Sequence, residues 1–270
     1  MFENYEHIEI ESFVRARDTA RLTVNRPARM NALGSKTRAE IVRALDEIEK
    51  NGQTRCLIIR GAGRRAFSSG EDLQESIGLS RRSIARWARG WSTFLTRIMK
   101  FPLPIVTASA GYVVGAGWQL FLLGDYRISS TNSKFAFPEV DRGLPSILSG
   151  AIIASMIGMA QLGRLTLMGD EITAKEALGM GLVHKIVPQS ELDSSSMQAA
   201  RKLAGKPITA VRLQRSWIQF KLLEDFRRSV RDAPSIYEDA FHSKEPKREI
   251  SAFLSRKIRS KRVEKSRTRY

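Results

Sequence analysis

The chain contains 270 residues, 42% of them apolar, and can therefore bury a sizeable hydrophobic core. Its one cysteine, Cys56, excludes a disulfide framework and, within the apolar run CLIIR, is expected in the core rather than as a nucleophile. The formal net charge is +17, and residues 247–270 alone carry ten Lys or Arg against two acids, so about half of the excess lies in a basic tail.

We expect this basic tail to be a solvated extension. The alternatives are a surface that docks an acidic partner, a nucleic acid or an anionic membrane. The amino-terminal segment is polar and acidic and lacks the pattern of a signal peptide, and the longest apolar stretches fall short of the ~20 residues that span a bilayer. A cytoplasmic protein without a membrane span is therefore expected.

Hydrophobic periodicity predicts alternating strands and helices. The β-rich segment 20–25 ends just before a proline, as a strand that leads into a turn does. Apolar side chains at helical spacing predict an amphipathic helix over residues 35–50. The same reasoning predicts strands at residues 56–60, 105–110 and 126–130, and helices at residues 83–101, 174–180 and 197–203.

This alternation predicts an enzyme of the α/β or α+β class. Helical patterns dominate after residue 149, and the breakers Gly205 and Pro207 precede the last long helical patterns. We therefore expect two regions, residues 1–204 as the core and residues 205–270 as a helical region with the basic tail.

Two glycine turns follow predicted strands and open toward predicted helices: FSSGEDL at Phe67–Leu73 and GYVVGAGWQL at Gly111–Leu120. In such turns, backbone N–H groups and a helix dipole point at one place, which is how a protein holds an oxyanion. A third segment, FAFPEV, presents the carboxylate of Glu139 beside the stiff Pro138. Donors for an enolate together with one base predict an active site.

The spacing does not support other kinds of site. Gly115 and Gly117 begin a G-x-G, but Leu120 stands where the third glycine of a dinucleotide fingerprint would be, and no P-loop motif occurs. The three histidines are scattered, so no metal site is expected, and His184 is predicted to be structural. The serines of the first glycine turn lack the histidine partner that a nucleophile needs.

The order of these motifs is more specific than any one of them. The chain contains NRPARMNAL at Asn25–Leu33, the two glycine turns, FPEVDRGLPS at Phe137–Ser146 and GLVHKIVP at Gly181–Pro188. This series resembles the crotonase, or enoyl-CoA hydratase/isomerase, superfamily over nearly the whole chain. The resemblance implies a crotonase-like spiral of ββα units and a C-terminal helical oligomerisation region that builds trimers, frequently paired into hexamers.

The resemblance also implies roles for individual residues. The backbone N–H groups of Glu71 and Ala116 would hold the oxyanion, so that the identity of their side chains is nearly irrelevant, and Glu139 would transfer the proton. Hydratases of the family use two glutamates; here the first is Gln119, whose amide can hold a water but has no basic form near neutrality. A proton shuttle needs one carboxylate, which favours an enoyl-CoA isomerase that acts through a thioester enolate.

No prosthetic group is implied, and coenzyme A enters as part of the acyl-CoA substrate. Its contacts would come from Arg29, Glu71, Asp72, Leu73 and Arg256, with Asp72 also expected to cap or brace its turn. A lysine common at one phosphate contact is replaced here by Gln74. The implied substrate pocket comprises Ser69, Gly70, Gly115, Gly117, Trp118, Tyr237 and Phe253.

Three alternatives stay open. The first is a hydratase in which Gln119 only orients water, and the second is an acyl-CoA thioester hydrolase or decarboxylase. The third is a basic family member without catalysis that binds RNA, although the retained Glu139 argues for an enzyme. Asp141, two residues beyond Glu139, is expected to be structural or solvated rather than catalytic.

Overall fold

The structure of the chain, a computed structural model, describes residues 3–13 and 18–267, except for the side chains of residues 81 and 257–267. Within these residues the strands form a six-stranded and a four-stranded sheet. The larger sheet runs in the order β1 (Ile8–Phe13), β2 (Thr19–Val24), β3 (Cys56–Gly61), β5 (Ile105–Ser109), β7 (Tyr126–Ser130) and β10 (Lys185–Val187). The smaller sheet runs in the order β4 (Ala66–Ser68), β6 (Tyr112–Val114), β8 (Lys134–Ala136) and β9 (Ile172–Thr173).

Parallel pairing dominates both sheets. Strands β2, β3, β5, β7 and β10 pair in parallel, and so do β4, β6 and β8, while β1 and β9 add antiparallel edges. The apolar runs CLIIRG in β3 and IVTAS in β5 are almost wholly buried. Such continuous burial is typical of parallel strands whose two faces are both covered.

The chain passes from the larger sheet to the smaller sheet and then into a helix three times. Strand β3 continues into β4 and then α2 and α3, β5 into β6 and α4, and β7 into β8 and α5. This repeat is the ββα spiral that the sequence resemblance implied. The α/β fold class is therefore confirmed.

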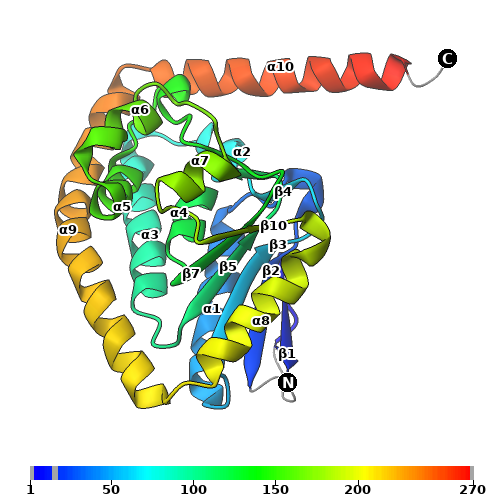
Figure 1. The fold of residues 1–270 in the computed structure, drawn as a ribbon. Helices are drawn as coiled ribbons and strands as arrows, with labels where there is room; N and C mark the ends of the chain where they lie inside the picture. Colours follow the sequence, from blue (N-terminus) through cyan, green and yellow to red (C-terminus); the bar gives the residue numbers. More distant parts are fainter. Residues whose placement is uncertain (1–2, 14–17, 268–270) are drawn as a thin grey trace.

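Helices cover the sheets on both sides (Figure 1). Helix α8 packs against β3, β5 and β7 on one face of the larger sheet, and α9 packs along α3 and α5 on the far side of the molecule. The helices are α1 (Ser35–Asn51), α2 (Leu73–Ser76), α3 (Arg81–Met99), α4 (Ala116–Leu122), α5 (Ile147–Ile157), α6 (Leu162–Thr166), α7 (Ala174–Gly179), α8 (Leu192–Ala204), α9 (Ile208–His242) and α10 (Glu245–Arg267).

The larger sheet separates two hydrophobic cores. The main core lies between the sheets and the inner helices, and there the fully buried Trp118 stacks on Phe137 with ring centroids 4.3 Å apart. The second core lies under α8 and contains Cys56, which is fully buried. The prediction that this cysteine belongs to the core is confirmed.

The last two helices differ in their surroundings. Helix α9 begins directly after the breakers at Gly205 and Pro207, and α10 crosses the top of the molecule and contacts the 3-10 turn η3 (Val140–Arg142) (Figure 1). The side chains of residues 257–270 lie outside the described residues, so the interpretations of the basic tail stay predictions, as does the boundary at residue 205. None of the described helices is both long and apolar enough to cross a membrane.

Candidate active site

A pocket of about 970 Å³ opens where the ends of the smaller sheet meet α3, α9 and α10. Its size lies within the usual range for sites that bind small molecules and cofactors. The residues predicted from the sequence that line it are Arg29, Ser69, Glu71, Asp72, Leu73, Gly115, Ala116, Gln119, Glu139, Tyr237, Phe253 and Arg256.

The two glycine turns touch each other through their main chains. A Cβ atom added to Gly70 would lie 2.6 Å from the carbonyl oxygen of Val114 and 3.1 Å from the backbone nitrogen of Ala116. Gly70 also has a φ of +84°, in the left-handed region that favours glycine. The peptide that carries the Glu71 N–H therefore lies close beside the N–H of Ala116.

These two N–H groups are available to a ligand. Ala116 is the first residue of α4, where a helix N–H has no partner within the helix and the helix dipole is positive. Among the hydrogen bonds of the described residues, neither the Glu71 N–H nor the Ala116 N–H donates to a protein acceptor. Both N–H groups belong to residues that line the pocket.

Glu139 brings a carboxyl group to the same place. It directly precedes η3, and its Oε1 lies 3.1 Å from the position that a Cβ on Gly115 would take. Within the described residues its Oε2 is buried without a hydrogen-bond partner. Burial raises the pKa of Glu139 to about 7, and the nearby charge of Glu71 adds to the rise. A carboxyl with such a pKa exchanges protons readily at neutral pH.

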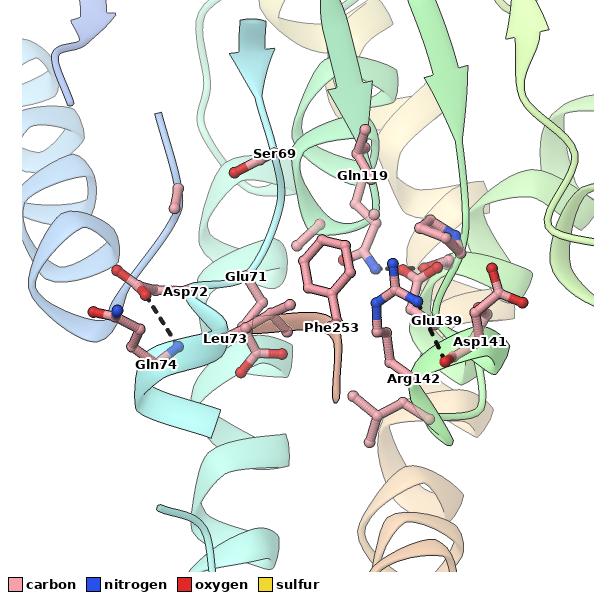
Figure 2. A pocket seen from close by; sticks show the side chains of 18 of the residues that line it. Ser69, Glu71, Asp72, Leu73, Gln74, Gln119, Glu139, Asp141, Arg142 and Phe253 are labelled. Atoms are coloured by element: carbon pink, nitrogen blue, oxygen red, sulfur yellow. Dashed lines mark hydrogen bonds between the residues drawn. The ribbon is translucent and has the colours of Figure 1, made fainter. Parts of the chain in front are cut away.

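The sequence resemblance aligns Gln119 with the first glutamate of the hydratases. Helix α4 holds it almost fully buried at the pocket, 7% exposed, and its Nε2 donates a hydrogen bond to Oγ of Ser149 at 2.5 Å. Figure 2 shows its amide on the same side of the pocket as Glu139. An amide fixed in this way can position a polar group but cannot take up a proton.

The side chain of Glu71 is a feature that the sequence reasoning missed. It enters the pocket as a second, half-buried carboxyl, opposite Glu139 in Figure 2. Its Oε1 accepts a hydrogen bond from Oγ of Ser76 at 2.6 Å and another from Nε1 of Trp87. Burial raises the pKa of this carboxyl above its usual value. No sequence signal indicates these two contacts together, because Ser76 lies on α2 and Trp87 lies on α3.

The model of the enoyl-CoA hydratase/isomerase family matches residues 16–260. This chain belongs to that family. It is 28% identical over 237 residues to the short-chain-enoyl-CoA hydratase of Clostridium acetobutylicum, a match that covers 87% of this chain and 91% of the relative. It is 30% identical over 197 residues to the 1,2-epoxyphenylacetyl-CoA isomerase of Escherichia coli (strain K12), with 69% and 72% covered.

The fold agrees with this family. The crystal structure of an enoyl-CoA hydratase from Mycobacterium avium subsp. paratuberculosis K-10 superposes with a TM-score of 0.82 at 20% identity, covering 93% of this chain and all of that one (100%). At this identity the likeness shows the fold alone. The chain is thus an enzyme of the crotonase superfamily, and since its relatives include both hydratases and isomerases, family membership does not choose between these reactions.

Asp72 braces the first glycine turn of this crotonase-family chain. Its side chain accepts a hydrogen bond from the backbone N–H of Gln74 at 3.3 Å and so caps α2, and it pairs with Arg26 at 3.0 Å. The expectation that it caps or braces the turn is confirmed. Arg29 and Arg256 line the pocket from η2 (Pro27–Arg29) and α10, so both basic side chains predicted for coenzyme A belong to the same cavity.

Two aromatic residues predicted for the pocket line it and are held by neighbours. The ring of Tyr237 meets Trp87 edge-on, with centroids 5.0 Å apart, and the guanidinium of Arg142 lies 3.9 Å from the centroid of the Phe253 ring. Figure 2 shows Phe253, from α10, between the Glu71 and Glu139 sides of the pocket.

Three residues assigned to the pocket from the sequence do not line it. Gly70 lies beneath the second turn, and a Cβ on Gly117 would lie 2.6 Å from Cβ of Ser68. Trp118 belongs to the main core, because α4 turns that side chain away from Gln119 and toward Phe137. Gly70 and Gly117 allow the backbones beside the site to pack closely. Trp118 packs in the core from α4, the helix that also carries Gln119.

His184 and Asp141, the two residues expected to be structural or solvated, are not held among the buried groups of the site. His184 accepts a hydrogen bond from the backbone N–H of Arg127 at 3.0 Å and stacks on Tyr126, outside the pocket lining. Its predicted structural role is confirmed. Asp141 lines the pocket but is exposed. Among the described residues, no group of three or more His, Cys, Asp or Glu side chains is suited to hold a metal ion.

Proposed function

We propose that this crotonase-family enzyme is an enoyl-CoA isomerase that moves a double bond from the 3-position to the 2-position of an acyl-CoA. The observation that carries the proposal is the pairing of Glu139 with Gln119 at the two positions where hydratases have two glutamates. Glu139 has a pKa suited to proton transfer, whereas Gln119 is an amide tied to Ser149. One acid–base group is sufficient for isomerisation and insufficient for a two-carboxylate hydration.

The geometry of the two turns supports a reaction in three steps. The thioester oxygen accepts hydrogen bonds from the N–H groups of Glu71 and Ala116, and the carboxylate of Glu139 removes a proton from C2. The electron pair moves onto the thioester oxygen as a dienolate, whose charge each N–H donor stabilises by about 3 kcal/mol. The carboxylic acid of Glu139 then returns the proton to C4, which leaves the double bond between C2 and C3.

Coenzyme A is proposed to enter along the basic side of the pocket. Arg29 and Arg256 supply charge for its phosphates, and the backbone of Asp72 and Leu73 lines the path of the pantetheine. These four residues line the same cavity as Glu139, which supports one continuous site for the thioester and its carrier.

We also propose that the enzyme is cytoplasmic and assembles as a trimer or a dimer of trimers, as the resemblance to the superfamily implies. Helix α9 leaves several large apolar side chains exposed, among them Leu213 at 67%, Trp217 at 62% and Phe220 at 47%. An exposed apolar surface of this kind is typical of a protein interface. Light scattering of the purified full-length chain measures the number of subunits directly.

The reaction is tested by offering the purified protein 3-enoyl-CoA and trans-2-enoyl-CoA separately. Rapid conversion of the first substrate, with no hydration of the second, is the expected result. Hydration of the second without conversion of the first would favour the hydratase alternative, in which Gln119 orients the water. Release of free coenzyme A would instead favour the thioester hydrolase.

A further inference from the structure

The two oxygens of the Glu71 carboxyl differ in the hydrogen bonds that they accept from the protein. Oε1 accepts the hydrogen bonds from Ser76 and Trp87. Oε2 makes no direct hydrogen bond or ion pair with a described residue, although Trp91, whose buried Nε1 also lacks a hydrogen-bond partner, lies close enough to lower the pKa of the carboxyl. The charge of Arg38 lowers the pKa of the carboxyl without an ion pair. Its guanidinium donates to the carbonyl oxygen of Leu33 and lies over the ring of Trp91. The carboxyl is therefore oriented by its two donors while its second oxygen stays open.

The surroundings of Glu71 are aromatic and aliphatic. Trp87, Trp91, Leu148 and Tyr237 line the same pocket, and Tyr237 is packed edge-on against Trp87. The carboxyl is half-buried, so its open oxygen still meets the pocket. A substrate that fills the pocket removes water from this oxygen, and a substrate group that pairs with it offsets the loss, whereas a plain alkyl chain does not.

In the proposed reaction, the Glu71 carboxyl lies near the reacting part of the substrate. The N–H of Glu71 is one of the two proposed oxyanion donors, so the thioester oxygen lies at the backbone of the same residue. A glutamate side chain is only a few bonds long, and its carboxyl can reach acyl carbons close to the double bond but not the distant coenzyme A.

We propose that Glu71 determines substrate specificity by hydrogen-bonding a hydroxyl group on the acyl chain, so that the enzyme prefers hydroxylated enoyl-CoA substrates over plain ones. This inference rests on the proposed isomerase function and deepens it. A hydroxyl both donates and accepts, so it pairs with Glu71 in either protonation state. An acyl chain that ends in a carboxylate is disfavoured, because Glu71 and Glu139 both face the cavity.

The test compares binding and turnover of matched thioesters. Saturated acyl-CoA and its analogues hydroxylated at C5, C6 or C7 are titrated by calorimetry into wild-type protein, Glu71→Met and Glu71→Gln. One hydroxylated analogue is expected to bind wild-type protein ~10-fold to 100-fold more tightly than the plain chain. Glu71→Met, of similar length but without a polar head, is expected to lose this preference, and Glu71→Gln to keep part of it through its amide oxygen.

Binding of saturated thioesters needs no reaction, so it separates this inference from the proposed isomerase function. If wild-type protein binds all chains equally, the specificity role is overturned even where isomerisation occurs. If both Glu71 variants bind normally but lose turnover of plain and hydroxylated 3-enoyl-CoA alike, Glu71 transfers a proton instead, and the inference is likewise overturned. Glu75→Gln, an exposed acid outside the pocket lining, serves as control, and thermal melts check that each variant is folded.

Discussion

The carboxyl of Glu139 rests against the backbone of Gly115, with Oε1 only 3.1 Å from where a Cβ atom would be. Gly115 also has a φ of +54° and a ψ of −124°, a combination that residues with a side chain avoid. This contact places the carboxyl against the residue that directly precedes Ala116. The proposed base thus contacts the residue that directly precedes one proposed oxyanion donor.

Gly115→Ala is expected to lower both stability and activity. The backbone strain costs about 1–3 kcal/mol, and the new methyl group displaces the Glu139 carboxyl, so kcat should fall more than the loss of folded protein explains. The matched control is Gly52→Ala, at a φ of +67° with nothing within 4 Å of the added Cβ. It shares the positive φ, in the milder left-handed region, without the contact, so thermal melts should shift in both variants and kcat in Gly115→Ala alone.

Glu139→Gln removes the proposed base while preserving its shape. We expect kcat for 3-enoyl-CoA to fall by about 10²- to 10⁴-fold with little change in the binding of a saturated acyl-CoA. Stopped-flow or steady-state assays measure the rate, and calorimetry measures binding. Asp141→Asn, a change in an exposed carboxyl two residues away, should leave kcat within a few-fold of the wild type. An active Glu139→Gln enzyme would contradict the assignment of the base.

The pH dependence of the rate follows from the raised pKa of Glu139. Because the base must be ionised, kcat/KM should rise as the pH rises through about 7 and then level off. Stability should change in the opposite direction. The folded protein binds this proton more tightly than the unfolded chain, so the stabilisation is complete below pH 4.5 and is lost as the pH rises through about 7. Denaturation curves of the wild type and Glu139→Gln across this range measure the difference, which should be absent if the pKa is not raised.

Restoring a carboxylate with Gln119→Glu should increase hydration of trans-2-enoyl-CoA. Ser149 can reverse its hydrogen bond, since a hydroxyl donates as readily as it accepts, so the new carboxylate fits the position of the amide. Absorbance of the conjugated thioester measures water addition. No gain in a folded variant would mean that the amide is not what limits hydration.

Phe253→Ala tests the contribution of α10 to the site. Loss of the ring removes part of the pocket wall, so KM for acyl-CoA should rise while kcat is nearly unchanged, and loss of its contact with Arg142 should lower stability by about 0.5–1 kcal/mol. The control is Phe13→Ala, which removes a similar ring from β1, where it lies beneath Arg21. This variant should leave KM unchanged. Equal effects of both variants would indicate a general loss of stability.

The long elements of the fold could be predicted because their periodicity extends over many residues. The expected helix at 35–50 appears as α1, and the strands at 56–60 and 126–130 appear as β3 and β7. Strands β4 and β6 have three residues each, too few for a pattern. The segment after β5 therefore reads as one strand entering a turn, whereas Gly111, at a φ of +64°, redirects the chain into the second sheet.

The site was predictable where a role belongs to the backbone or to a short motif. The two glycine turns and Glu139 come together from three separate segments, as motif order indicated. The directions of side chains were harder to predict, because they depend on how α4 packs. Gln119 faces the pocket, whereas the preceding Trp118 faces the core. The buried contacts of Glu71 join residues from different helices, and no local pattern encodes them.

The close approach of Gly70 to the second turn brings one stretch of main chain against another. The proposed stabiliser of negative charge is consequently made of backbone N–H groups, which every amino acid except proline supplies. Descendants of such a scaffold can exchange Gln119 or Glu71 in a single mutational step and still retain an intact enolate cradle. Duplicated genes that encode this fold would then diverge in reaction and substrate specificity before they diverge in fold.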